Sequence, residues 1–184
     1  MTRLHSICVY CGSYSGVKPE YAQAARDLGH LLARTGRTLV YGGGSIGLMG
    51  EAARAARALG GRVIGVIPGH LNTRERAYHD VDLRVVDSMH ERKQTMADLG
   101  DGFMALPGGL GTFDELFEIL TWNQIGLHGK PVGLLNVAGY FDALLGLIEQ
   151  AVREGFAPDT ARSRIFVADR PDALLQAMES FDGA

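Results

Sequence analysis

The chain has 184 residues, of which 46% are hydrophobic and 21% charged, a composition typical of globular proteins. Its formal net charge of −3 gives no basic surface for nucleic acid, and no apolar run approaches the ~20 residues of a membrane helix. The length suits one compact domain over residues 1–184, and the N-terminus lacks a signal-peptide pattern. We therefore expect a cytoplasmic protein with neither nucleic-acid nor membrane partners.

The first apolar run, residues 6–10, predicts a central buried strand. It ends in a loop rich in glycine and serine, residues 11–16, in which Ser13 supplies a hydroxyl suited to phosphate or ribose. The loop lacks the Gly-x-Gly-x-x-Gly dinucleotide fingerprint, and taken alone it is more simply a turn between strand and helix. Pro19 then predicts the first turn of a helix that ends near Thr35.

Cys8 and Cys11 are the only cysteines and form a Cys-x-x-Cys pair. A structural zinc site would need two more ligands at matching spacing, and the chain has no second cysteine pair. If Cys8 lies in the strand, the two side chains point to opposite faces. We expect a buried, structural Cys8 and a Cys11 at the edge of the loop.

Residues 38–41 predict the second strand, and a glycine cluster over residues 42–50 follows it before an alanine-rich helix. A glycine cluster between strand and helix is typical of a phosphate cradle, which makes Gly43 and Gly44 candidate ligand-binding residues. The cluster lacks the Gly-Lys-Ser/Thr ending of a P-loop, so ATP hydrolysis is not indicated. Close packing between the helix and the sheet is the alternative role for these glycines.

A third strand is predicted at residues 62–67, followed by a polar stretch at 70–80 that is either a solvated loop or an active-site flap. The next strand, at 83–86, leads into a helix for which Asp87 or Ser88 is a candidate cap. Arg92 and Lys93 lie ~100° apart on this helix, so both can border one pocket and bind an anion. A solvated charged face is the alternative.

The run 102–106 predicts another buried strand, and the sequence Pro-Gly-Gly-Leu-Gly-Thr-Phe-Asp-Glu follows it at residues 107–115. We expect a helix to begin near Thr112, with Thr112 as its N-cap and Glu115 three residues on, the spacing of a capping box. Free amides at such a helix start favour a phosphate. Glu115 either closes the capping box or turns its carboxylate into the pocket that the glycines open, and the spacing leaves both interpretations open.

Further strands at 131–135 and 165–167 alternate with helices at 141–153 and from Pro171 onwards. This alternation predicts an α/β fold: a Rossmann-like, doubly wound parallel sheet of about seven strands with helices on both faces. In such folds ligands bind beyond the carboxyl ends of the strands. The three glycine-containing loops all follow strands, so we expect them to converge on one crevice.

Three motifs carry a family resemblance. Residues 107–115 resemble the Pro-Gly-Gly-x-Gly-Thr-x-x-Glu signature of the Lonely Guy (LOG) family of cytokinin-activating phosphoribohydrolases. The stretch 89–93, with its Arg-Lys pair, resembles the family's second motif, and residues 42–50 resemble its upstream glycine cluster. The motifs come in the family's order, and the resemblance covers nearly the whole chain.

The resemblance implies an enzyme that hydrolyses the N-glycosidic bond of cytokinin riboside 5′-monophosphates, releasing the free base and ribose 5-phosphate without a metal or a cofactor. It implies that Glu115 and Arg92 are catalytic. The residues it implies for substrate binding are Gly108, Gly109, Gly111, Thr112, Asp114, Lys93 and Glu75, together with the loop residues Ser13, Gly43 and Gly44. The family often has Glu at position 114, where this chain has the shorter Asp. Family members are usually dimers, and the apolar residues 113–122 are one candidate for the contact surface.

Two other functions stay open. One is an AMP nucleosidase acting on unmodified purine monophosphates, and the other is a non-catalytic binding protein similar to molybdenum-cofactor carriers. Relatives with this signature are often labelled lysine decarboxylases, a chemistry that needs a lysine bound to pyridoxal phosphate. Of the three lysines, Lys18, Lys93 and Lys130, none lies in a recognisable cofactor motif, and we reject that label.

Overall fold

The computed structural model describes residues 3–73 and 77–181, so the predicted ligand-binding residue Glu75 lies outside the described part of the chain. The strands are β1 (Ser6–Tyr10), β2 (Thr38–Tyr41), β3 (Val63–Pro68), β4 (Asp82–Val86), β5 (Gly102–Ala105), β6 (Val132–Leu135) and β7 (Ile165–Ala168). The helices are α1 (Pro19–Arg34), α2 (Gly47–Ala58), α3 (Met89–Leu99), α4 (Leu110–Gln124), α5 (Asp142–Arg153), α6 (Thr160–Ser163) and α7 (Pro171–Glu179). Short 3-10 turns follow β3 and β6 (η1, Gly69–Leu71; η2, Val137–Gly139).

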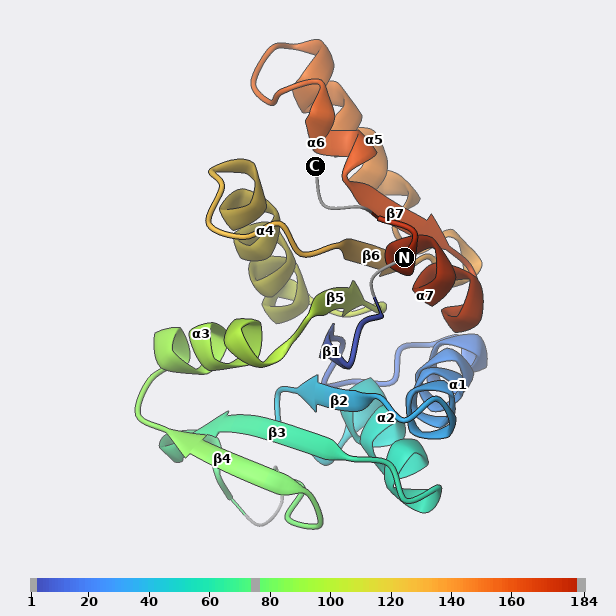
Figure 1. Cartoon of the computed structure of the whole chain (residues 1–184), viewed down its shortest axis with the longest axis vertical. Coiled ribbons are helices and arrows are strands. Elements are labelled where there is room, and N and C mark those ends of the chain that lie inside the picture. Colours follow the sequence, from blue (N-terminus) through green and yellow to red (C-terminus); the bar gives the residue numbers. More distant parts are fainter. Residues whose placement is uncertain (1–2, 74–76, 182–184) are drawn as a thin grey trace.

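The seven strands form one sheet in the order β4-β3-β2-β1-β5-β6-β7, and each neighbouring pair is parallel. The predicted doubly wound parallel sheet is therefore confirmed (Figure 1). The chain runs outward from β1 to β4, then returns to the other side of β1 and runs outward again from β5 to β7. The order reverses between β1 and β5, at the centre of the sheet.

Two apolar cores lie on the two faces of the sheet. One unites α1, α2 and α7 with the side chains of alternate strand residues, including Val9 and Met104. The other unites α3, α4 and α5 with the intervening residues, including Cys8 and Phe103. Figure 1 shows α1, α2 and α7 on one side of the sheet and α3 and α4 on the other. Because successive strand residues alternate between faces, a strand covered on both sides is apolar over its buried length, as β1 is over residues 7–10.

Helix ends follow local chemistry where the sequence offers a cap. The Ser88 hydroxyl accepts a hydrogen bond from the Glu91 amide at 3.1 Å, so Ser88 rather than Asp87 caps α3. Glu91 in turn accepts a hydrogen bond from the Asp87 amide at 2.8 Å.

The four-residue helix α6 and the two 3-10 turns were not predicted, since such short elements carry no hydrophobic period. No helix in the described part of the chain is long and apolar enough to cross a membrane.

Helices α1 and α2 pack closely because Gly29 of α1 faces the α2 backbone. A Cβ at Gly29 would overlap the carbonyl oxygen of Ala52 and lie 3.0 Å from the Cβ of Ala55. Gly146 of α5 offers a contrast, because it is exposed and a Cβ there would meet no atom of the described chain within 4 Å. Both glycines lie inside helices.

We expect Gly29→Ala to lower the free energy of unfolding by about 1–3 kcal/mol, since the new methyl group must push the two helices apart. Gly146→Ala is the matched control and should raise the free energy of unfolding by about 0.5–1 kcal/mol, because alanine loses less backbone entropy in a helix. Urea unfolding of both variants measures the two changes. A neutral Gly29→Ala would contradict the close packing.

Candidate functional site

The site lies at the carboxyl ends of β1 and β5, where the strand order reverses. Tyr10 and Ala105 are register partners at the ends of these two strands, and the Leu106 amide donates to the Tyr10 carbonyl at 2.9 Å. The chains leaving the two strands must diverge to opposite faces, since α1 and α4 cover different sides. A reversal of this kind opens a crevice between the two loops.

Hydrogen bonds and close contacts join the three glycine-containing loops. The Gly12 amide donates to the Pro107 carbonyl at 3.0 Å, which ties the loop after β1 to the loop after β5. The Gly12 carbonyl accepts from the Met49 amide at 3.3 Å, which ties it to the start of α2. A Cβ at Gly47 would overlap the backbone of Ser13. The glycines therefore permit the loops to touch.

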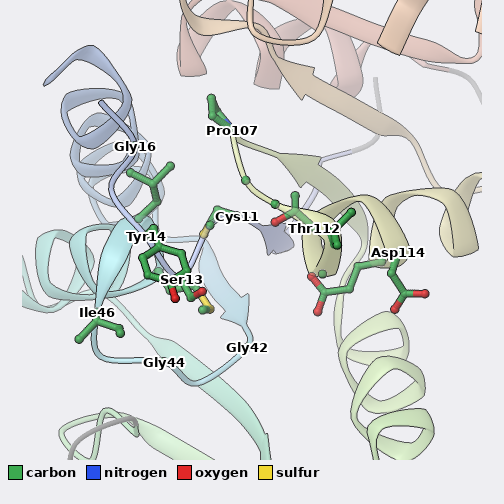
Figure 2. A pocket seen from close by; sticks show the side chains of 18 of the residues that line it. Cys11, Ser13, Tyr14, Gly16, Gly42, Gly44, Ile46, Pro107, Thr112 and Asp114 are labelled. Carbon is green, nitrogen blue, oxygen red and sulfur yellow. The ribbon is translucent and has the colours of Figure 1, made fainter. Parts of the chain in front are cut away.

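Residues of all three loops line one cavity of about 830 Å³, which confirms the predicted convergence. Figure 2 shows Thr112 and Asp114 of α4 on one side of this cavity and Ser13, Tyr14 and Ile46 facing them from the other. The predicted site residues that line the cavity are Ser13, Gly44, Arg92, Gly108, Gly109, Gly111, Thr112, Asp114 and Glu115. Gly43 and Lys93 are not among the lining residues.

The start of α4 differs from the prediction. The helix begins at Leu110 with Gly109 as its N-cap and no side-chain cap, so the predicted N-cap at Thr112 is wrong. The glycines let the chain enter the helix three residues earlier than the capping pattern indicates, with the N-cap at Gly109 instead of Thr112. Thr112 is buried, and its hydroxyl lies so close to Gly108 that a Cβ there would overlap it. The amides of the first turn have no acceptor within the helix and sit in the cavity wall.

Since no capping box forms, the capping interpretation of Glu115 falls away. Its carboxylate, 9% exposed, accepts a hydrogen bond from Nη1 of Arg92 at 2.5 Å. Arg92 is 8% exposed, and its Nε donates to the Val66 carbonyl at the end of β3 at 3.1 Å. A Cβ at Gly42 would overlap Nη2 of Arg92, so the glycine makes room for the guanidinium. The ion pair thus joins α3 to α4 across the end of the sheet.

Burial raises the pKa of Glu115 above its ordinary value, because the charged form loses its hydration. The guanidinium of Arg92 opposes this shift through its charge and its hydrogen bond, and Asp114 reinforces it as a neighbouring negative charge. A buried carboxyl with a raised pKa and one cationic partner, facing a cavity, is a typical arrangement of functional sites.

Lys93 lies on the outer side of the same helix pair. Its ammonium contacts the carboxylate of Asp114 at 3.2 Å and that of Glu118 at 3.0 Å. These carboxylates raise the pKa of Lys93 and outweigh its partial desolvation. Lys93 therefore fixes Asp114, which does line the cavity, while the lysine itself stays outside the lining. Its predicted contact with substrate remains a prediction.

Gly43 packs against neighbouring strands and does not line the cavity. Its φ is +76°, and a Cβ there would lie 3.1 Å from Ile67 and 3.2 Å from Leu83. The Gly43 carbonyl also accepts from the Tyr78 amide at 2.9 Å. The left-handed conformation and the contact with β3 and β4 account for this glycine without a ligand.

The two cysteines lie on opposite faces, as predicted, and both are free and buried. Burial raises the pKa of Cys8 to about 12 and that of Cys11 higher still, so both thiols stay protonated at neutral pH. Cys11 contributes to the cavity wall. Within the described residues, no three His, Cys, Asp or Glu side chains are placed together to hold a metal ion.

Sequence reasoning missed several side chains that line the cavity. Apolar and aromatic residues form much of the remaining wall, among them Tyr14, Ile46, Met49, Ile67, Leu71, Met89 and Tyr140. They come from several separate segments of the chain, and each alone is an ordinary core or loop residue. Gly42 was within reach of prediction, since it belongs to the glycine cluster that follows β2.

A family model described as "Possible lysine decarboxylase" matches residues 49–178. Cytokinin riboside 5′-monophosphate phosphoribohydrolase LOG of Oryza sativa subsp. japonica is 50% identical over 181 residues, which cover 98% of this chain and 75% of that protein. LOG3 of Arabidopsis thaliana, with the same activity in its name, is 49% identical over 98% of this chain and 84% of its own length.

Among solved structures, the molybdenum cofactor binding protein of Rippkaea orientalis resembles the fold with a TM-score of 0.72. The two share 26% sequence identity over 98% of each chain. The much higher identity to the phosphoribohydrolases decides between the two groups. The chain belongs to the LOG family of cytokinin riboside 5′-monophosphate phosphoribohydrolases, as its three motifs indicated.

Proposed function

We propose that this chain, as one domain, hydrolyses the N-glycosidic bond of cytokinin riboside 5′-monophosphates to give the free base and ribose 5-phosphate. The observation that carries the proposal is the buried Glu115–Arg92 pair, set in the wall of the cavity beside the glycine turn that opens α4. The identity of 48–50% to relatives named for this activity supports the substrate class.

The 5′-phosphate binds at the start of α4. Gly108, Gly109 and Gly111 line the cavity there, and a Cβ at Gly109 or Gly111 would meet open space, so a ligand can approach the backbone closely. The free amides of the first turn and the positive end of the helix dipole favour an anion. Thr112 adds a hydroxyl, and Ser13 approaches from the facing loop.

Glu115 supplies the negative charge that the reaction needs. As the glycosidic C–N bond breaks, positive charge develops on the ribose, and a carboxylate held in a buried site stabilises it strongly. The same carboxylate accepts a proton from the water that attacks C1′ and later releases it to solvent, while the departing base takes up one proton from solvent at its nitrogen. Asp114, also in the wall, binds the ribose hydroxyls.

Arg92 orients this carboxylate and holds the nucleotide. Two of its donors are already committed, to Glu115 and to the Val66 carbonyl, so its guanidinium plane is fixed before substrate arrives. A preorganised charge requires no rearrangement during the reaction. The base then rests against the apolar wall, to which α2, β3 and α3 contribute Met49, Ile67 and Met89.

The alternatives fit less well. None of the lysines lines the cavity formed by the described residues, and Lys93 and Lys130 have acceptors elsewhere, so a Schiff-base decarboxylase has no lysine in place. A carrier without turnover is supported by the structural likeness at 26% identity. An AMP nucleosidase shares all the proposed steps and differs only in the base.

We also propose a homodimer and a cytoplasmic location. Phe117 and Leu120 of α4 and Ile148 of α5 line a second cavity of about 320 Å³, and Phe156, which follows α5, is 88% exposed. Apolar side chains gathered on one face favour association with a second copy. Two cysteines that form no disulfide are compatible with a reducing compartment.

Glu115→Gln should keep the fold and lower kcat at least about 100-fold, since the amide can neither stabilise the cationic ribose nor accept the proton. The assay measures release of free base from isopentenyladenosine 5′-monophosphate and from AMP, side by side. Glu118→Gln, one turn further along α4 and outside the cavity, is the matched control and should keep most of the activity. If the wild type releases base from neither substrate, the carrier function is favoured. The ratio of kcat/KM for the two substrates distinguishes a cytokinin phosphoribohydrolase from an AMP nucleosidase.

The carboxyl of Glu115 should titrate above 4.5, the ordinary glutamate value, because burial disfavours its charged form. Carbon-13 NMR of the glutamate carboxyl groups measures this, and the signal lost in Glu115→Gln assigns it. Arg92→Gln should raise the pKa further, since it removes the charge that favours ionisation. A resonance that titrates below 4.5, or that moves down in Arg92→Gln, would contradict the burial argument.

Light scattering at micromolar concentration should give about twice the chain mass of 19.8 kDa. Phe156→Glu should shift the protein toward the monomer, because burying the new carboxylate in the contact surface between two copies costs free energy. His30→Glu, on α1 and away from this face, is the control for added charge. A monomeric wild type refutes the dimer.

A further inference from the structure

Tyr140 reaches the glycine turn from a distant part of the chain. Its hydroxyl donates a hydrogen bond to the Gly108 carbonyl, although 32 residues separate the two. Tyr140 follows η2, after β6, and is half-buried at the cavity wall. None of the three family motifs includes it, and the reaction steps above do not use it.

The segment that carries Tyr140 is held in an unfavourable conformation. Ala138 has a φ of +51°, and among the described residues no other non-glycine has a positive φ. Such a conformation is disfavoured for alanine and persists only where the surroundings impose it. Asn136 does so: its side-chain oxygen accepts from the Phe141 amide at 2.7 Å, and its amide nitrogen donates to Asp142 at 2.7 Å.

Aromatic contacts then fix the ring itself. The Tyr140 ring packs edge-on against Tyr21, with centroids 5.7 Å apart, and against Phe141 at 5.1 Å. Tyr21 also lines the cavity and supports the first loop, since a Cβ at Gly16 would lie 2.7 Å from its ring. The hydroxyl of Tyr140 therefore has little freedom to leave Gly108.

The consequence follows from the geometry of the peptide bond. The peptide between Gly108 and Gly109 is planar and trans, so its carbonyl and its N–H point in opposite directions. Between two glycines this plane can rotate readily. A donor that holds the carbonyl at Tyr140 directs the Gly109 N–H the other way and keeps a carbonyl oxygen from turning toward a bound anion.

We propose that Tyr140 is a positioning residue for the phosphate-binding turn: its hydrogen bond to the Gly108 carbonyl orients the Gly109 amide toward the substrate's phosphate. The inference rests on the proposed function, in which this turn binds the 5′-phosphate. In this proposal Tyr140 increases the affinity for the phosphate and takes no part in cleavage of the glycosidic bond.

The test is Tyr140→Phe, which deletes the hydroxyl and keeps the ring packing. Affinity for ribose 5-phosphate, measured by titration calorimetry, should fall about 3- to 10-fold, the effect of one hydrogen bond. KM for isopentenyladenosine 5′-monophosphate should rise by a similar factor while kcat stays within about twofold. Isopentenyladenosine, which lacks the phosphate, should bind to variant and wild type with the same affinity in the same calorimeter.

Tyr41→Phe is the matched control. The Tyr41 hydroxyl is buried, has no hydrogen-bond partner in the described chain and lies outside the cavity lining, so its loss should leave all three measurements unchanged. Urea unfolding confirms that both variants fold.

An unchanged affinity for ribose 5-phosphate overturns the proposal. An equal loss with nucleotide and nucleoside overturns it as well, because that pattern indicates general damage to the cavity. If the wild type binds ribose 5-phosphate but turns over neither nucleotide, the proposed reaction fails while the calorimetry still tests Tyr140. If the wild type does not bind ribose 5-phosphate, the turn is not a phosphate site and both fail.

Discussion

The ion pair between Arg92 and Glu115 is the interaction on which the site depends. Burying two charges removes their hydration, and a pair of apolar residues at such positions is often as stable or more so. The chain nevertheless keeps the guanidinium between the end of β3 and helix α4, with Gly42 leaving the space for it. A buried ion pair that borders a cavity is therefore better explained by chemistry than by folding.

The topology explains why this pair lies beside the turn that we propose as the phosphate site. Because β1 and β5 are neighbours from which the chain departs in opposite directions, their following loops diverge and leave a crevice between α1 and α4. The loop after β2 closes it from one side. Residues that are remote in sequence, such as Ser13 and Thr112, therefore face the same cavity (Figure 2).

A shared fold does not decide between a carrier and an enzyme. The molybdenum cofactor binding protein of Rippkaea orientalis has the same architecture at 26% identity, whereas relatives at 48–50% identity are named as hydrolases. Turnover requires a charged group beside the bond that breaks, which binding alone does not. In this chain Glu115 lies in the cavity wall with Arg92 as its partner, and we propose that it has this role.

The sequence by itself determined the alternation of strands and helices, the parallel sheet and the three glycine-containing loops, because buried strands and helix faces have distinct hydrophobic periods. It also indicated Glu115 and Arg92, through their resemblance to the motifs of the LOG family, whereas spacing alone left the role of Glu115 open. It misplaced the cap of α4, since Thr112 and Glu115 satisfy a capping pattern that the preceding glycines make unnecessary.

Only the tertiary structure decided which way side chains point. Adjacent positions on α3 diverge, so Arg92 reaches the cavity while Lys93 pairs with Asp114 and Glu118 on the outer side. Gly43 packs on β3 while Gly44 lines the cavity. The contact between Tyr140 and Gly108 depends on the pairing of β5 with β6, and no local pattern records a contact made 32 residues away.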